Sequence, residues 1–419
     1  MRMHCFLGFA LILLPASTSR RDQGAPQLVF GTYLGGRHKD FATGVAVDGS
    51  GNAYLTGRTL SPDFPVTDGA FIVTSAVNND DWVGFVTKVT DQGNRFLYST
   101  FLGGNYRSSA NAISVDSSGR AFVAGSTCSS NFPTTPLAIL RKAPGSNKPD
   151  TCDGFVAVLD PTGRHLEYGT YLGGRGEDSA ATVALAPNGD VVYVGGYTSS
   201  PDFPVTESAI QRKLQGSING FLSAIDWRSG KLLYSTYLGG NSADNVTTLA
   251  VTQDGSVYVG GVTQSARWPN VVFRQFGECG ASDGFIIKLD LKRRLRPEGI
   301  RIGGSGNEDV AAMDVDSEGN LYVVGSTDSQ NFPQKGARFP KAGSSFALKI
   351  AGREFSAGSG SVKWSRRVGG RATTRCSPCR QRCLARCSLR EGAVPAIFRR
   401  PPVLSTAVYQ RKMTQSSCV

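Results

Sequence analysis

A pair of adjacent glycines recurs five times along this 419-residue chain and constrains its fold more than any other feature. The spacings between successive pairs are 68, 70, 66 and 64 residues, which suits one supersecondary unit repeated in tandem, with insertions in its loops. A unit of this length can hold four strands. The first glycines of the pairs are Gly35, Gly103, Gly173, Gly239 and Gly303.

Each copy contains four strand-like runs in the same order, separated by turn residues. Val, Ile, Tyr and Phe dominate these runs, which favours a pleated, half-buried surface. No helical pattern of useful length competes with them. In the second copy the predicted strands are Asn111 to Val115, Ala121 to Ala124, Phe155 to Leu159 and Leu166 to Leu172.

Two further motifs accompany each glycine pair. A hairpin such as VDGSGNAYLTG from Val47 places Gly between two strands, where its tolerance of positive φ suits a tight turn. An aromatic residue followed by Pro comes next, and it can fill the gap between neighbouring units while Pro ends the strand pairing. These aromatic-Pro markers are Asp63-Phe64-Pro65, Asn131-Phe132-Pro133, Asp202-Phe203-Pro204, Arg267-Trp268-Pro269 and Asn331-Phe332-Pro333.

Tandem four-stranded antiparallel units are most simply the blades of a β-propeller, which leaves only short, protected sheet edges. The runs YSTYLGG from Tyr234, ATGVAVDGSGNAYLTG from Ala42 and SPDFPVT from Ser61 resemble the SBBP family, a β-propeller repeat found mostly in bacterial exported proteins. The resemblance covers about residues 28 to 350. It implies a propeller scaffold outside the cytoplasm and brings no catalytic residues to this sequence.

The sequence therefore predicts an all-β protein of five complete blades and a disrupted sixth over residues 22–370. Leu28 to Leu34 matches a fourth strand whose first three partners are missing, so we expect it to close a ring with the other end of the chain. Residues 1–21 combine a basic start, an apolar core from Phe6 to Leu14 and small residues, as in a secretory signal peptide. No other segment is apolar enough for an integral membrane span.

Residues 371–419 depart from the repeat. Residues 351–419 hold 14 Lys or Arg against 2 Asp or Glu, whereas residues 1–350 hold 31 of each, so the net charge of +12 lies in residues 351–419. A shifted reading frame would let Arg371 to Cys379 encode GDDAVLAV, a strand signature of the repeat. Our hypothesis is that a frameshift replaced the sixth blade with a disordered basic peptide. Its four clustered cysteines, from Cys376 to Cys387, do not have the spacing of a common zinc module.

Carboxylates recur near the start of four of the five predicted blades and are the candidate site residues. They are Asp40, Asp178 and Asp244, with Glu308 or Asp309 in the fifth copy and Ser108 in the second. Two interpretations stay open. Asp40, Asp178, Asp244 and Asp309 could ring the propeller axis and hold a hard cation such as Ca²⁺, which prefers several oxygen ligands. Alternatively, each carboxylate accepts backbone N–H groups and fixes its own crossing loop.

Cys128 and Cys152 lie in one long predicted loop of the second copy, and an exported protein meets conditions in which disulfides persist. They are a candidate disulfide, although sequence alone cannot supply the required geometry. Cys279 has no obvious partner.

The sequence contains no recognisable set of catalytic residues. Its three histidines include His4 in the predicted signal peptide, and the others occupy non-equivalent repeat positions. We expect an exported scaffold at the cell surface that binds an extracellular protein or carbohydrate, not nucleic acid, through its loops. Pro133 to Cys152 and Thr263 to Asp283 are the longest of these. Two alternatives remain: a structural envelope or matrix protein without a ligand, and an exported metal-dependent hydrolase or dehydrogenase with an axial site.

Overall fold

The computed structural model describes residue 28 and residues 30–76, 81–144, 151–291, 297–336 and 344–368, with the backbone alone for residues 356–360. The predicted signal peptide and the predicted frameshifted tail lie outside these residues.

The described strands form five sheets, in each of which neighbouring strands along the chain are hydrogen-bonded neighbours, with one exception in the fourth sheet. The first sheet is β1 (Asp40–Val47), β2 (Ala53–Thr59), β3 (Val83–Val89) and β4 (Phe96–Leu102). The second is β5 (Ser108–Val115), β6 (Ala121–Thr127), β7 (Asp153–Leu159) and β8 (Leu166–Leu172). The third is β9 (Asp178–Leu185), β10 (Val191–Thr198), β11 (Asn219–Asp226) and β12 (Lys231–Leu238).

The fourth sheet contains β13 (Asp244–Val251), β14 (Val257–Thr263), β15 (Val272–Gly277), β16 (Asp283–Leu289) and β17 (Glu298–Gly303). The fifth contains β18 (Glu308–Val315), β19 (Leu321–Thr327), β20 (Ser345–Ile350) and β21 (Val362–Val368), with the 3₁₀ helix η1 (Gly352–Ser361) before the last strand. No helix in the described part of the chain is long and apolar enough to cross a membrane.

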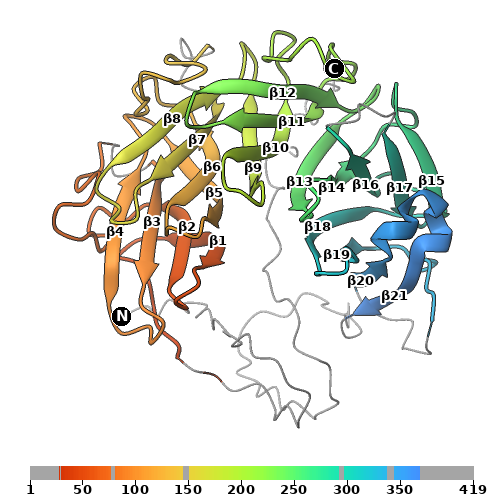
Figure 1. The fold of residues 1–419 in the computed structure, drawn as a ribbon, viewed down its shortest axis with the longest axis horizontal. Coiled ribbons are helices and arrows are strands. Elements are labelled where there is room, and N and C mark those ends of the chain that lie inside the picture. The colour runs from red at the N-terminus through yellow and green to blue at the C-terminus, as the bar shows by residue number, and fades with distance from the viewer. Residues whose placement is uncertain are drawn as a thin grey trace, which may run out of the picture.

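Figure 1 shows the five sheets side by side in an arc, with β1, β5, β9, β13 and β18 nearest its centre and the first and fifth sheets at its two ends. The inner strands β5, β9, β13 and β18 each pack against at least three strands of the preceding sheet. The predicted all-β propeller architecture with five complete blades is therefore confirmed.

A β-bulge interrupts the inner strand of every sheet at the same register. In three copies the extra residue has a polar side chain that reaches the backbone of the next sheet. The Thr43 hydroxyl donates to the carbonyl of Ala110 over 2.5 Å, and the Asn111 amide donates to that of Ala180 over 3.0 Å. Thr247 contacts Val310 in the same way. In these three blades the bulge thus turns one residue of the inner strand into a link to the next sheet.

Four apolar clusters fill the spaces between adjacent sheets, and each draws residues from both sides. The aromatic of every marker is buried and packs on an aromatic residue in the third antiparallel strand of its own sheet, with ring centroids 4.4 to 4.8 Å apart. These pairs are Phe64–Phe85, Phe132–Phe155, Phe203–Phe221, Trp268–Phe285 and Phe332–Phe346.

The hairpin turns form as their sequence predicts. Asp48 accepts hydrogen bonds from the backbone N–H groups of Ser50 and Asn52, both over 3.0 Å. Gly51 has a φ of 83°, a conformation that an L side chain rarely adopts. Asp116 and Asp316 open equivalent turns in other copies.

Two expectations about secondary structure were wrong. Phe30 to Leu34, within the predicted closing strand Leu28 to Leu34, form no strand and pair with none of the described sheets. Leu34 nevertheless packs on the first sheet. The predicted loop Thr263 to Asp283 contains β15, which pairs in parallel with β17 and buries Phe276 against the fifth sheet.

Candidate functional site

The acidic positions predicted from the sequence lie at the first residue of the inner strands. Asp40, Asp178 and Asp244 begin β1, β9 and β13, and each pairs with a threonine that ends the next strand. Glu308 holds this place in the fifth sheet and Ser108 in the second. The carboxylates accept the backbone N–H of the second glycine of the preceding pair, over 3.0 Å at Gly36, 2.7 Å at Gly174, 2.8 Å at Gly240 and 2.7 Å at Gly304.

Asp309 lies one residue beyond the equivalent position and accepts the Ser326 N–H over 2.8 Å. Ser108 contacts Thr127 through their hydroxyls, 2.8 Å apart. Within the described ranges no three His, Cys, Asp or Glu side chains come together as a metal-binding group. Asp40, Asp178, Asp244 and Glu308 thus each bind their own crossing loop, as the second of the two interpretations expects, whereas Asp309 does not.

Burial sets the electrostatics of these carboxylates. Asp178 is 0% exposed, and loss of hydration raises its pKa to about 6, against the opposing hydrogen bonds from Thr198, Gly174 and Ser200. Desolvation likewise raises the pKa of Asp244. A buried acid with a raised pKa is often functional, but these groups face backbone N–H donors and hydroxyls of their own loop. Their contacts explain a role in positioning that loop.

A second set of contacts closes the same end of the sheets, which we call the marker face because it carries the Gly-Gly turns and the aromatic-Pro markers. In four copies the residue after the glycine pair donates its backbone N–H to the side-chain oxygen of the residue that opens the marker. These contacts are Arg37 to Asp63 at 3.0 Å, Asn105 to Asn131 at 2.8 Å, Arg175 to Asp202 at 2.9 Å and Ser305 to Asn331 at 2.8 Å.

The junction between the third and fourth sheets is the exception. Its marker opens with Arg267, whose side chain has no acceptor oxygen, so the backbone N–H of Asn241 is left without this partner. A pocket of about 370 Å³ lies here. Its lining includes Gln215, Asn241, Arg267, Trp268 and Pro269.

A pocket of about 210 Å³ occupies the equivalent junction between the first and second sheets. Asn131 lines it, and its side-chain oxygen already accepts the N–H of Asn105. The rest of its lining includes the apolar side chains of Phe71, Ile72 and Phe101. The same place in the fold thus has an internal hydrogen bond from the crossing loop to the marker residue at one junction, and lacks that bond at another.

A buried arginine supports the loop beside the larger pocket. The Arg301 guanidinium donates to the carbonyl of Ser265 over 2.6 Å and lies 3.8 Å from the Asp283 carboxylate. Both side chains are less than 10% exposed. Tyr237 occupies the position of Arg301 in the third sheet, where its hydroxyl donates to the carbonyl of Ser200 over 2.7 Å. In the fourth sheet an arginine therefore takes the place of the tyrosine that, in the third sheet, holds the loop leading to the aromatic-Pro marker.

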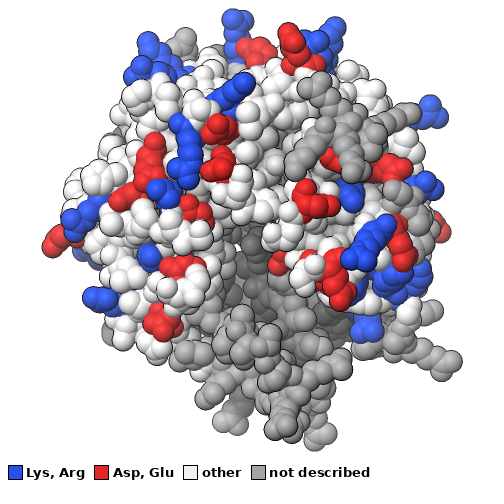
Figure 2. All heavy atoms as spheres, in the orientation of Figure 1, with Lys and Arg blue, Asp and Glu red and all other residues white. Residues whose placement is uncertain are grey.

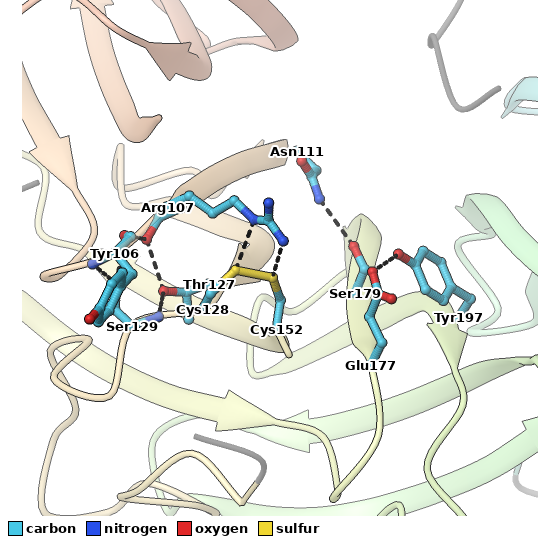
Figure 3. The surroundings of a disulfide bond; sticks show 11 residues. Tyr106, Arg107, Asn111, Thr127, Cys128, Ser129, Cys152, Glu177, Ser179 and Tyr197 are labelled. Carbon is cyan, nitrogen blue, oxygen red and sulfur yellow. Dashed lines mark hydrogen bonds between the residues drawn. A yellow bond between two sulfur atoms is a disulfide. The ribbon is translucent and has the colours of Figure 1, made fainter. Parts of the chain in front are cut away.

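Cys128 and Cys152 form a disulfide at the marker end of the second sheet, with the sulfur atoms 2.01 Å apart. It joins the end of β6 to the start of β7. Figure 3 shows the Arg107 guanidinium reaching both sulfur atoms, with Nε 3.1 Å from Cys128 Sγ and Nη2 3.7 Å from Cys152 Sγ. Cys279 is a free, exposed thiol.

The sequence alone predicted the acidic positions but not the pocket. The signal was present, because Arg267 is the one basic residue among the five that open the markers. Arg301 was also visible, as the replacement of an aromatic residue two places before a glycine pair. Neither Arg267 nor Arg301 indicates a pocket until the structure shows that the loops on either side of it lie together.

The chain is similar in part to one curated protein and to several solved structures. A segment of 252 residues, 57% of this chain, is 26% identical to the regulatory protein FlaEY of Caulobacter vibrioides, and it spans a quarter (25%) of that protein. The β-propeller domain of the trilobed protease from Pyrococcus furiosus, described as having an open velcro topology, is 7% identical over 80% of this chain and 72% of its own, with a TM-score of 0.38. Hydrazine synthase of Kuenenia stuttgartiensis is 11% identical over 76% of this chain and 66% of its own, with a TM-score of 0.40.

The family model described as SBBP, beta-propeller repeat, matches residues 29–65, 97–133 and 300–333. Each matched segment ends at the proline of an aromatic-Pro marker, at Pro65, Pro133 and Pro333. The described sheets are four-stranded blades around these segments, with a fifth strand in the fourth sheet. The chain therefore carries the SBBP β-propeller repeat.

Proposed function

We propose that this chain is an exported β-propeller scaffold that binds an extracellular protein or carbohydrate at the cell surface through its marker face. The observation that carries the proposal is the open junction between the third and fourth sheets. A rigid frame of repeated sheets with one departing loop site is the usual arrangement of a binding protein, since variable loops on a fixed scaffold supply specificity.

The surface charge supports a partner other than nucleic acid. Figure 2 shows Lys and Arg interspersed with Asp and Glu over the described part of one face, with large neutral areas between them. A binding surface for a phosphate backbone gathers basic residues on one face or stripe. Export is proposed from the signal-like start of the sequence and from the Cys128–Cys152 disulfide, which suits an oxidising compartment.

The test measures binding of the purified, labelled full-length chain to intact cells and isolated envelopes of the producing bacterium. We expect saturable binding that falls at least tenfold when Gln215 and Asn241 are both replaced by Ala. Gln92, exposed in the β3–β4 turn at the opposite end of the first sheet, provides the matched control, and Gln92→Ala should bind like the parent. Fractionation of the producing cells should find the protein outside the cytoplasm.

Two other results would reject the proposal. Retention in the envelope without saturable binding would favour a purely structural role. An activity that is lost on chelation and in Asp178→Ala or Asp244→Ala, with folding intact, would favour a metal-dependent enzyme with an axial site.

A further inference from the structure

We call a junction closed where the residue after the glycine pair donates its backbone N–H to the side chain that opens the marker. These junctions show what kind of group the crossing loop binds. In the first sheet the Asp63 carboxylate accepts the backbone N–H of Arg37 at 3.0 Å and its Nε at 2.9 Å. Asp202 accepts the N–H of Arg175 at 2.9 Å, and its second oxygen lies 3.5 Å from that arginine's Nε. At two places the protein therefore holds its own carboxylate between a backbone N–H after a glycine pair and a guanidinium.

The junction between the third and fourth sheets has no internal carboxylate at this place, and its two donors come from two residues. The N–H of Asn241 corresponds to those of Arg37 and Arg175, and a guanidinium comes from Arg267, which stands at the marker position of Asp63 and Asp202. Arg267 is exposed, and its side chain makes no ion pair with a described residue. The side-chain amides of Gln215 and Asn241 line the same pocket and have no hydrogen-bond partner in the described part of the chain.

We infer that this pocket binds the carboxylate of an acidic sugar, a uronate residue of a cell-surface or extracellular polysaccharide; the inference rests on the proposed binding function and names its ligand class. Arg267 and the Asn241 N–H receive the carboxylate, as the arginine and N–H of the closed junctions receive Asp63 and Asp202. The two amides each donate and accept, which matches sugar hydroxyls.

The remaining lining favours a sugar over an acidic peptide. The exposed ring of Pro269 offers apolar surface to the C–H face of a pyranose, and the buried Trp268 lies beside it in the lining. Trp268 is held in place by its Nε1–H bond to the Thr263 hydroxyl, 3.1 Å, and by contact with Phe285. The volume of the pocket, about 370 Å³, suits one or two sugar units. Extended peptides more often add to a free sheet edge, which this pocket does not provide.

The experiment titrates the full-length chain with trisaccharides of galacturonate, glucuronate and mannuronate, with galactotriose as the neutral control and a hexaglutamate peptide as the competing class. Isothermal calorimetry should detect at least one uronate trisaccharide, bound at least tenfold more tightly than galactotriose. The affinity should weaken as salt rises, because a charge pair carries part of it.

Arg267→Asp is the decisive variant, because it restores the residue that closes the equivalent junction at Asp63 and Asp202. We expect it to fold, with an unchanged or higher melting temperature, and to lose at least tenfold in uronate affinity. Arg267→Lys should retain part of the affinity, and Gln92→Ala all of it.

The inference is overturned if no uronate binds, if Arg267→Asp binds as the parent does, or if hexaglutamate binds and the uronates do not. Saturable binding to cells that survives Arg267→Asp would reject the uronate site and leave the proposed scaffold function standing. Absence of saturable binding to cells in the parent chain would reject the proposed function itself.

Discussion

The junction between the second and third sheets and the junction between the third and fourth are built from equivalent loops, and they differ at the residue that opens the marker. Asp202 closes the first by accepting the N–H of Arg175, whereas Arg267 leaves the second open beside a pocket of about 370 Å³. The order of the four repeated strands is the same in the third and fourth sheets, and the fourth sheet adds β15 after its marker. A repeat protein can thus lose a structural contact at one junction and keep its sheet architecture.

The largest expected effect concerns the support of the open junction. Arg301→Ala should lower the free energy of unfolding by about 3 to 5 kcal/mol, because it leaves the buried Asp283 carboxylate without its cation and the Ser265 carbonyl without its donor. Urea unfolding followed by tryptophan fluorescence measures the change.

The third sheet supplies the control for that variant. It has Asn219 and Tyr237 where the fourth sheet has Asp283 and Arg301. The double variant Asp283→Asn with Arg301→Tyr should recover most of the lost stability. A loss below about 1 kcal/mol in Arg301→Ala would contradict the view that this pair holds the marker loop.

The next effect is a pH dependence of stability that we expect from Asp178, at the start of an inner strand, and not from Ser108, which holds the same place in the second sheet. The pKa of Asp178 is raised from 3.8 to about 6, so between these values the folded state holds a proton that the unfolded state has released. Its contribution to stability therefore falls as pH rises from about 4 to 6, by up to about 3 kcal/mol. Asp178→Asn should flatten this part of the stability profile.

Thermal melting at pH 4, 5, 6 and 7 tests the expectation. Ser108→Ala alters the equivalent place in the second sheet, which carries no charge, and should shift stability by a similar amount at every pH. An unchanged pH slope in Asp178→Asn would show that other groups govern the acid range.

The sequence predicted this fold well because each repeat is locally self-consistent. Turn glycines such as Gly51, strand composition and the markers all indicate the same unit, and the described strands begin and end close to the predicted runs. It could not choose between Glu308 and Asp309, because that choice depends on which residue pairs with Thr327 across the sheet. β15 was missed since its pairing with β17 spans a loop and needs an exposed sheet edge.

The pocket could not be predicted for a related reason. Gln215, Asn241 and Arg267 come from three different loops, and no local pattern says that these loops meet. Their positions in the repeat are regular, so a structure of one junction would have allowed the others to be inferred. Arg267, which stands where the other described markers have Asp or Asn, then identifies the junction that differs from the other described junctions.

The smallest expected effect tests how the closed junction is held. Asp202→Ala removes the acceptor of the Arg175 N–H and should cost about 1 kcal/mol, whereas Asp202→Asn retains an acceptor and should cost about 0.5 kcal/mol or less. Asn131 and Asn331 already perform this role at two junctions, so the repeat itself supplies the precedent. Amide hydrogen exchange of Arg175 gives the local readout, which should quicken in the alanine variant alone. Equal exchange rates in the two variants would mean that the ion pair with the Arg175 guanidinium, and not the N–H contact, closes this junction.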